Sequence, residues 1–199
     1  MSRKDCEKLK EQYISNGRLK SYKSYQEYFL NLKLAKEFYI PLSIVEISFR
    51  NSLNHFFNTK IGYDWLFRDD ILQADAQRSI TNAISILKQQ NKNITQDNLI
   101  AELSFGFWVK LLTSAYNSFL RYNDLKKIFP NLPSKQDKSI NRHFIFVKLN
   151  SIRLFRNKVF HHDKIINKQE YENMEKEIYE VLSYFDKNIE KITRKLNTN

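Results

Sequence analysis

The chain has 199 residues, and its 42% hydrophobic and 14% aromatic content is enough to fill one sizeable core. The 33 Lys and Arg outnumber the 22 Asp and Glu, and the formal charge of +11 attracts phosphate polymers such as nucleic acids. An AT-rich coding sequence would enrich lysine in the same way whatever the function. The single cysteine, Cys6, excludes an intramolecular disulfide, and without a CxxC or His/Cys cluster no metal site is expected.

The chain contains few residues that interrupt regular structure. Only three Gly and three Pro occur, so the regular elements must be long, which favours helices. Three glycines are too few to form a P-loop, a dinucleotide-binding fingerprint or a nucleophile elbow. The sequence therefore does not support nucleotide hydrolysis or redox chemistry, and no cofactor is expected. The N-terminus lacks the apolar core of a signal peptide, and no apolar stretch is long enough to span a membrane. We therefore expect a cytoplasmic protein without membrane contact.

The first half of the chain shows helical periodicity. Apolar residues recur at spacings of three and four from residue 21 to about residue 57. Pro41 lacks an amide donor, so we predict two helices here, the second beginning near Pro41. A connector containing Trp65 follows, and the pattern then predicts a helix from about Ala74 to Gln90. Thr95 lies where it can cap the start of the next helix.

Residues 99–122 (LIAELSFGFWVKLLTSAYNSFLRY) form the most apolar run of the sequence. Because its bulky residues occupy more than one face, this run predicts the central helix of the core. Two prolines in the segment FPNLPS predict a loop. After it, Ser134 and Asp137 have the spacing of a capping box, which predicts a long helix ending at about His161.

The last helix is predicted to open at Asn167, with Glu170 in the capping-box position, and its apolar stripe continues to the end of the chain. No segment alternates with a period of two, and no hairpin turn signal occurs, so a sheet is not expected. The sequence therefore predicts a single all-α domain over residues 1–199. Residues 1–40 form an N-terminal helical extension in this prediction, and residues 41–199 form the helical core.

Side chains that can carry out catalysis gather in the segment SIRLFRNKVFHHDKIIN, at the end of the penultimate predicted helix. Steps of four place Arg153, Asn157 and His161 on one stripe, so Asn157 can orient the imidazole one turn later. Arg156 and His162 lie beside this stripe. Cleaving RNA without a metal needs a base, an acid and a cation for the developing phosphorane charge, which histidine and arginine supply. The alternative is a surface helix end where the histidines interact with the helix dipole.

This segment resembles the HEPN ribonucleases, whose signature is Arg, then usually Asn, Asp or His, and then His four to six positions beyond the Arg. Arg156, Asn157 and His161 match the signature, and His162 also fits the permitted spacing. The doubled HH after RN, together with LIAELSFGFWVKLL and FRNSLNHFFNTKIGYDWL, resembles the Abi-like phage-abortive-infection branch. The resemblance covers most of residues 40–165 and implies an HEPN-like helical bundle with additional N-terminal helices.

The resemblance also implies a function. The implied activity is that of a metal-independent endoribonuclease, which cleaves an RNA substrate and leaves 2′,3′-cyclic phosphate ends. The implied biological role is that of a toxin in phage abortive infection, with a protein or RNA antitoxin as its partner. His161 is then the acid or base, and Arg156 holds the scissile phosphate. Asn157 positions the imidazole, and His162 either shares proton transfer or holds the loop. Because one helix rarely presents a full catalytic set, two copies around a two-fold axis are expected to form a homodimer.

The Arg-Asn-x-x-x-His spacing occurs a second time, at Arg50, Asn51 and His55. Either Arg50 or His55 lines the same cleft and assists phosphate binding or completes the catalytic set, or the repeat is a coincidence between two amphipathic helices. We treat Arg50, together with Arg153 and Lys158, as candidate RNA-binding residues only. The competing hypothesis for the whole chain is a non-catalytic helical module that binds RNA or a partner protein.

Overall fold

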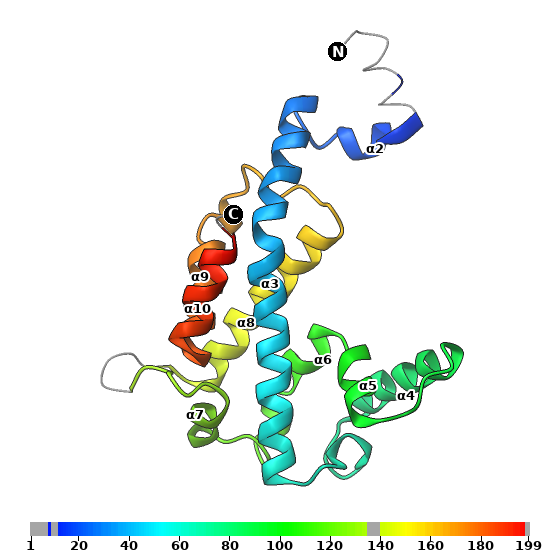
Figure 1. The fold of residues 1–199 in the computed structure, drawn as a ribbon, viewed down its shortest axis with the longest axis vertical. Coiled ribbons are helices and arrows are strands. Elements are labelled where there is room, and N and C mark those ends of the chain that lie inside the picture. The colour runs from blue at the N-terminus through cyan, green and yellow to red at the C-terminus, as the bar shows by residue number, and fades with distance from the viewer. Residues whose placement is uncertain (1–7, 9–11, 135–139, 198–199) are drawn as a thin grey trace.

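Helices make up the regular structure of the chain (Figure 1). A computed structural model describes residues 8, 12–134 and 140–197, and within these residues no β-strand occurs, so the prediction of an all-α fold is confirmed. Among the described helices, none combines the length and the apolar character needed to cross a lipid bilayer. The α-helices of this part are α2 (Asn16–Leu19), α3 (Tyr25–Lys60), α4 (Ala74–Gln89), α5 (Gln96–Glu102), α6 (Phe105–Lys110), α7 (Leu125–Ile128), α8 (Arg142–Phe160), α9 (Met174–Phe185) and α10 (Lys187–Asn197).

Helix α3 is the central element, and α6, α7, α8, α9 and α10 pack against it. The predicted break at Pro41 is wrong, because Pro41 lies buried inside this one continuous helix. A proline costs about 3 kcal/mol inside a helix, whereas each fully buried apolar side chain contributes about 1.5–3 kcal/mol. Burial on the C-terminal side of the proline outweighs its cost; the fully buried residues there are Leu42, Val45, Phe49, Leu53 and Phe57. The division into residues 1–40 and 41–199 stays a prediction, and α3 passes through that boundary.

The elements directly after α3 follow the sequence prediction. The connector holds a short 3₁₀ turn, and Trp65 within it is fully buried and stacks on Phe57 with 4.6 Å between ring centroids. Helix α4 spans Ala74–Gln89. Thr95 caps α5, because its hydroxyl oxygen accepts a hydrogen bond of 3.2 Å from the backbone N–H of Asn98. The start of α5 depends on local capping chemistry, which a sequence displays directly.

Residues 99–122 do not form the single central helix that their composition predicts. Helix α5 ends at Glu102, Leu103 is extended, and Ser104 begins α6 by accepting a hydrogen bond of 3.3 Å from the N–H of Phe107. A serine that caps a new helix competes with continuation of the previous one. Short helices and 3₁₀ turns let bulky residues reach the core from several directions, and the buried ones include Leu99, Leu103, Phe105, Phe107, Trp108, Leu111 and Leu112.

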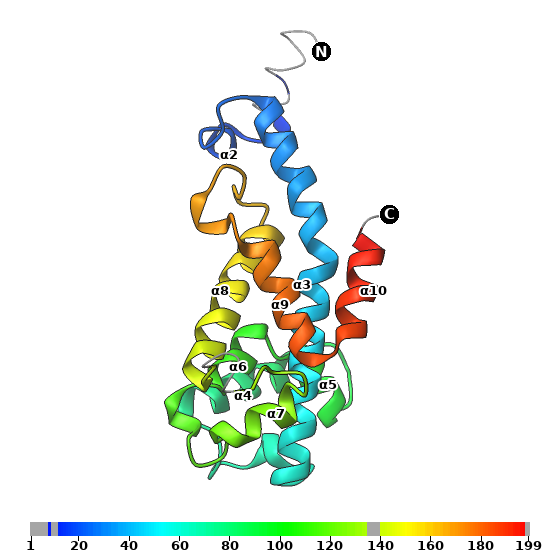
Figure 2. The ribbon, with the colours of Figure 1, turned by 90° about the vertical axis from the view of Figure 1, so that its left-hand side faces the viewer.

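Helix α8 runs in the opposite direction to α3 and ends directly before His161, as predicted (Figure 1 and Figure 2). Its start is capped by Asn141, whose side-chain oxygen accepts a hydrogen bond of 2.8 Å from a backbone N–H in the first turn. The capping box predicted for Ser134 and Asp137 includes residues outside the described ranges. Because the two helices are antiparallel, the C-terminal end of α8 lies beside the N-terminal half of α3.

The C-terminal segment forms two helices where the sequence predicts one. The predicted start at Asn167 with Glu170 is wrong, since α9 begins at Met174 after a 3₁₀ turn. Asp186 is extended and separates α9 from α10, which turns back alongside α3 (Figure 2). The reversal divides the predicted apolar stripe, so that Ile192 and Leu196 are 58% and 53% exposed.

Candidate active site

Arg156 is held by an ion pair between two helices. Its Nε donates to Oε2 of Glu46 on α3 at 3.0 Å, and its guanidinium carbon lies 4.2 Å from the centroid of the Phe160 ring. The side chains of Arg156 and Glu46 are only 28% and 17% exposed. The two terminal nitrogens of Arg156 make no hydrogen bond to a described residue. Glu46 and Phe160 thus orient a guanidinium that can still bind an anion through these nitrogens.

The two histidines terminate α8 in a Schellman motif. The N–H of Asp163 donates to the carbonyl of Lys158 at 2.9 Å, and the N–H of His162 donates to the carbonyl of Val159 at 3.1 Å. His162 has φ of 57°, the left-handed conformation that glycine usually adopts at this position. The side chains of His161 and His162 are both exposed. The backbone geometry of this helix end therefore does not need an imidazole at residue 162.

Asn157 is connected to His161 through the backbone. The N–H of His161 donates to the carbonyl of Asn157 at 3.0 Å, and between these two described residues no side-chain hydrogen bond occurs. The role of Asn157 in orienting the imidazole therefore stays a prediction. At about 100° per residue, His161 is rotated roughly 140° around the helix from Arg156. Arg156 faces α3 while His161 faces solvent, so one chain does not turn the two side chains to the same side.

Two of the candidate RNA-binding residues on α8 have partners within the chain. Arg153 donates from Nε and one terminal nitrogen to Oδ1 of Asn150, at 3.0 and 2.9 Å. Its side chain lies against Gly106 of α6, where an added Cβ would be 3.6 Å from the Arg153 Cδ. Lys158 is exposed and forms an ion pair of 3.0 Å with Asp163. Lys158 is thus close to the histidines, whereas Arg153 lies two turns back along α8.

The second Arg-Asn-x-x-x-His copy lies along α3. Arg50 follows Glu46 by one turn, and its Nε is buried without a hydrogen-bond partner among the described residues. Asn31 of α3 contacts the loop that follows His161 and His162. A helix rises about 1.5 Å per residue, so His55 lies roughly 35 Å further along α3 than Asn31. Within one chain, the second histidine is therefore remote from His161.

A buried asparagine holds the loop that follows the histidines. Asn31 is fully buried, and its Oδ1 accepts hydrogen bonds from the N–H groups of Ile165 and Ile166 at 2.7 and 2.9 Å. Its Nδ2 donates to the carbonyl of Asp163 at 3.1 Å. Asn31 is not among the residues predicted from the sequence. The available signal was a polar side chain on the stripe that also buries Tyr28, Ala35 and Leu42.

A charged cluster supports the same loop from the start of α3. Oε1 of Glu27 lies 2.9 Å from Nζ of Lys164 and accepts a hydrogen bond of 3.1 Å from the Asn167 amide. The backbone N–H of Lys23 donates to the other carboxylate oxygen. The hydrogen bond from Lys23, followed by that from Lys164, lowers the pKa of Glu27 to about 2. The carboxylate therefore stays ionised at neutral pH, and the loop is attached to α3 by both charge and buried hydrogen bonds.

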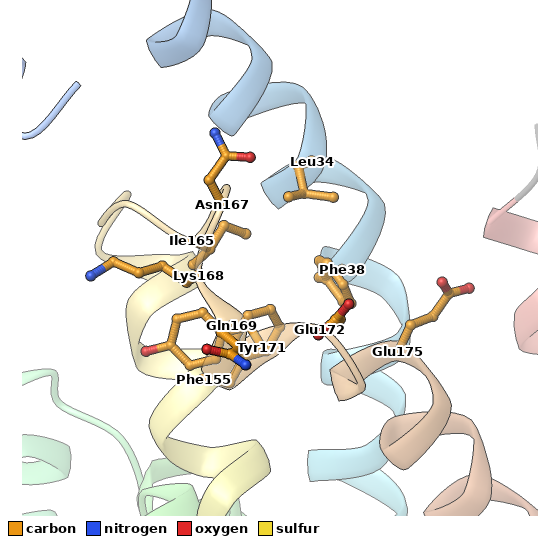
Figure 3. A pocket seen from close by; sticks show the side chains of 10 residues that line it. All are labelled: Leu34, Phe38, Phe155, Ile165, Asn167, Lys168, Gln169, Tyr171, Glu172 and Glu175. Carbon is orange, nitrogen blue, oxygen red and sulfur yellow. The ribbon is translucent and has the colours of Figure 1, made fainter. Parts of the chain in front are cut away.

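An apolar pocket of about 570 Å³ lies behind the motif, between α3, α8 and the loop (Figure 3). Its floor includes Leu34, Phe38, Phe155 and Tyr171, and the Phe155 ring lies 4.8 Å from that of Phe38 and 4.9 Å from that of Tyr171. The rim carries the carboxylates of Glu172 and Glu175, next to polar residues Asn167, Lys168 and Gln169. Two carboxylates repel phosphate, so this pocket does not suit the RNA backbone.

Comparison with protein-family models, with curated proteins and with solved structures gives no match. Within the described ranges, no three His, Cys, Asp or Glu side chains gather in a way that could hold a metal ion. The class that the fold and the site define is an all-α protein whose basic helix end combines an oriented guanidinium with two exposed imidazoles.

Replacing His162 by glycine is expected to raise the free energy of unfolding by about 0.5–1 kcal/mol, since glycine adopts the left-handed conformation without steric cost. Asn91 is the matched control, because it occupies the same Schellman position after α4 with φ of 53°. Asn91→Gly should also raise the free energy of unfolding. Urea denaturation of both variants measures this effect, and a loss of stability confined to His162→Gly would show that the imidazole itself supports the loop.

Proposed function

We propose that this chain is a metal-independent endoribonuclease of the HEPN type that acts as a toxin in phage abortive infection. The observation that supports the proposal is the arrangement at the end of α8. There, Glu46 orients the Arg156 guanidinium, and the exposed His161 and His162 follow directly at the helix end. Phosphodiester transesterification requires an oriented cation and groups that can transfer protons, and this helix end supplies an arginine and two imidazoles.

In the proposed reaction, an imidazole accepts the proton of a ribose 2′-hydroxyl, and that oxygen attacks the adjacent phosphorus. The bond from phosphorus to the 5′-oxygen breaks, and the leaving oxygen takes a proton from a second group, which acts as the acid. The terminal nitrogens of Arg156 bind the non-bridging oxygens as their charge develops. The products are a 2′,3′-cyclic phosphate and a 5′-hydroxyl, with His161 as the principal acid or base.

The proposal includes a homodimer. Arg156 faces α3 and His161 faces solvent, so a second chain related by a two-fold axis is the simplest source of the missing group. Each motif would then supply a proton-transfer group to a phosphate bound by the other. A cytoplasmic location and an antitoxin of protein or RNA belong to the same proposal, because an unrestrained ribonuclease would damage the cell that makes it.

The test is incubation of the wild-type protein and His161→Ala with total bacterial RNA in EDTA, followed by end-group analysis of the fragments. Fragments with cyclic-phosphate ends are expected from the wild type, and their yield should fall by about 10²–10⁴-fold in the variant. Equal cleavage by both proteins would remove His161 from the mechanism. Intact RNA in both samples, with a protein that is folded and dimeric, would reject the nuclease.

One observation favours the competing function, a non-catalytic helical module. Glu46 already neutralises Arg156, and a half-buried ion pair between two helices is also a plain structural contact. In that case the His161→Ala variant should bind RNA or a partner protein like the wild type, and neither protein should produce new RNA ends.

A further inference from the structure

A polar groove lies between residues 15–24 and the loop that follows the two histidines. Arg18 donates from a terminal nitrogen to the carbonyl of His162 at 2.7 Å, and Lys164 donates to the carbonyl of Ser21 at 2.7 Å. These two bonds join segments that are far apart in the sequence. Two hollows of about 330 Å³ and 520 Å³ lie next to these bonds, and Ser21, Asp163 and Lys164 line both. His162 lines the smaller hollow, so the groove opens beside the candidate active site.

The groove has an excess of positive charge. Lys158 is neutralised by Asp163 at 3.0 Å, and Lys164 by Glu27 at 2.9 Å. Arg18 and Lys168 line the hollows without an ion pair to a described residue. Figure 3 shows the Lys168 ammonium pointing away from the apolar floor of the neighbouring pocket. Two cations are therefore available to a bound anion.

The same groove contains three side chains with hydroxyl groups, and those of Ser15 and Ser21 hydrogen-bond to the backbone of Arg18. Ser15, Ser21 and Tyr22 line the smaller hollow. The Tyr22 hydroxyl is buried and has no hydrogen-bond partner among the described residues, although a buried hydroxyl without a partner is costly. The Lys164 ammonium lies 5.1 Å from the Tyr22 ring centroid. A ligand with several acceptor oxygens would pair with both cations.

We propose that this groove binds the RNA backbone next to the bond that is cleaved, with Arg18 and Lys168 contacting phosphates. The inference rests on the proposed function for its choice of ligand. Phosphodiester oxygens fit the planar donors of an arginine and the point charge of a lysine, and a strand in the groove passes directly beside His162. Residues 15–24 therefore form part of the substrate site rather than a structural appendage to α3.

The experiment measures binding of a fluorescently labelled single-stranded RNA by anisotropy, in a His161→Ala background so that the RNA is not consumed. Arg18→Ala and Lys168→Ala are each expected to weaken binding about tenfold. The slope of log affinity against log salt should become shallower by about 0.7 for each phosphate that the protein no longer neutralises. Arg18→Lys should recover part of the affinity, because it retains the charge without the planar donors.

Matched controls lie elsewhere on the surface. Arg78 is exposed and, like Arg18, donates to a backbone carbonyl, that of Ala74 at 3.3 Å. Lys92 is an exposed lysine in the loop between α4 and α5. Arg78→Ala and Lys92→Ala should change binding less than about twofold, since distant surface charges are screened beyond about 10 Å.

Separate readouts distinguish failure of the groove from failure of the nuclease. If the wild type cleaves RNA but the groove variants bind it as well as their background, the groove inference is overturned and the nuclease stands. If the groove variants lose affinity while the wild type leaves RNA intact, the groove stands as an RNA-binding site and the nuclease, with its cleaved bond, fails. Equal losses in the groove and control variants, or no RNA binding at all, overturn the inference. An acidic protein would then be the better ligand for the groove.

Discussion

Replacing Arg156 by lysine is expected to lower the rate of RNA cleavage by about 10²–10³-fold, the usual effect of removing one oriented donor from a transition-state site. The arginine uses Nε to bind Glu46 at 3.0 Å and retains two terminal nitrogens for the phosphate. A lysine has a single ammonium, which cannot bind the carboxylate and both phosphate oxygens with the same geometry. Initial rates of cleavage of a labelled oligoribonucleotide, at equal concentrations of folded protein, measure the effect.

Arg194→Lys is the matched control for this variant. Arg194 on α10 donates from Nε to Glu190 at 2.9 Å, and its guanidinium carbon lies 3.7 Å from the Tyr179 ring centroid. The carboxylate and ring contacts thus repeat those of Arg156 at a place remote from the motif. The control should cleave RNA like the wild type. If both variants retain full activity, Arg156 is a structural residue and the phosphate-binding role assigned to it is wrong.

Replacing Asn31 by leucine is expected to lower the free energy of unfolding by about 3–5 kcal/mol, since each buried polar group left without a partner costs about 1–3 kcal/mol. The substitution keeps the number and branching of the side-chain heavy atoms but deprives the N–H groups of Ile165 and Ile166 and the carbonyl of Asp163 of their partner. Urea denaturation measures the loss. Cleavage should fall as well, because this loop holds the position of His162.

Asn51→Leu tests the same exchange on the exposed face of α3, where the change in stability should stay within about 0.5 kcal/mol. Asn31→Asp keeps the acceptor for the two N–H groups but turns an oxygen toward the Asp163 carbonyl and buries a carboxylate, so it should also destabilise the protein. A leucine variant as stable as the wild type would mean that the loop finds other partners and that Asn31 does not determine its position.

Local chemistry made part of the fold predictable. The cap at Thr95, the span of α4 and the end of α8 before His161 depend on a few neighbouring residues, and all three appear in the structure. The break predicted at Pro41 is wrong because the local cost of the proline is smaller than the free energy gained by burying the rest of α3. The single helix predicted for residues 99–122 is wrong for the opposite reason, because the local cap at Ser104 begins a new helix where the apolar composition favoured a continuous one.

The candidate site also has a part that the sequence predicts and a part that only the tertiary structure shows. The arginine and the two histidines lie within seven positions of one helix end, so the sequence alone could place them together. Their partners are far away along the chain. Glu46 is separated from Arg156 by 110 positions, and Arg18 from His162 by 144. No spacing rule connects residues at such separations, and only the packing of α8 and its loop against α3 makes them neighbours.

The sequence by itself determined that this protein is helical, basic, and equipped with an Arg-Asn-x-x-x-His segment at a helix end, because periodicity, charge and capping are properties of neighbouring residues. The tertiary structure alone decided that α3 is continuous and central, that Glu46 orients Arg156, and that Asn31 and Arg18 hold the histidine-bearing loop. Those features come from burying apolar surface and satisfying polar groups across the whole chain, and their free energies exceed the local preferences that a short window of sequence displays.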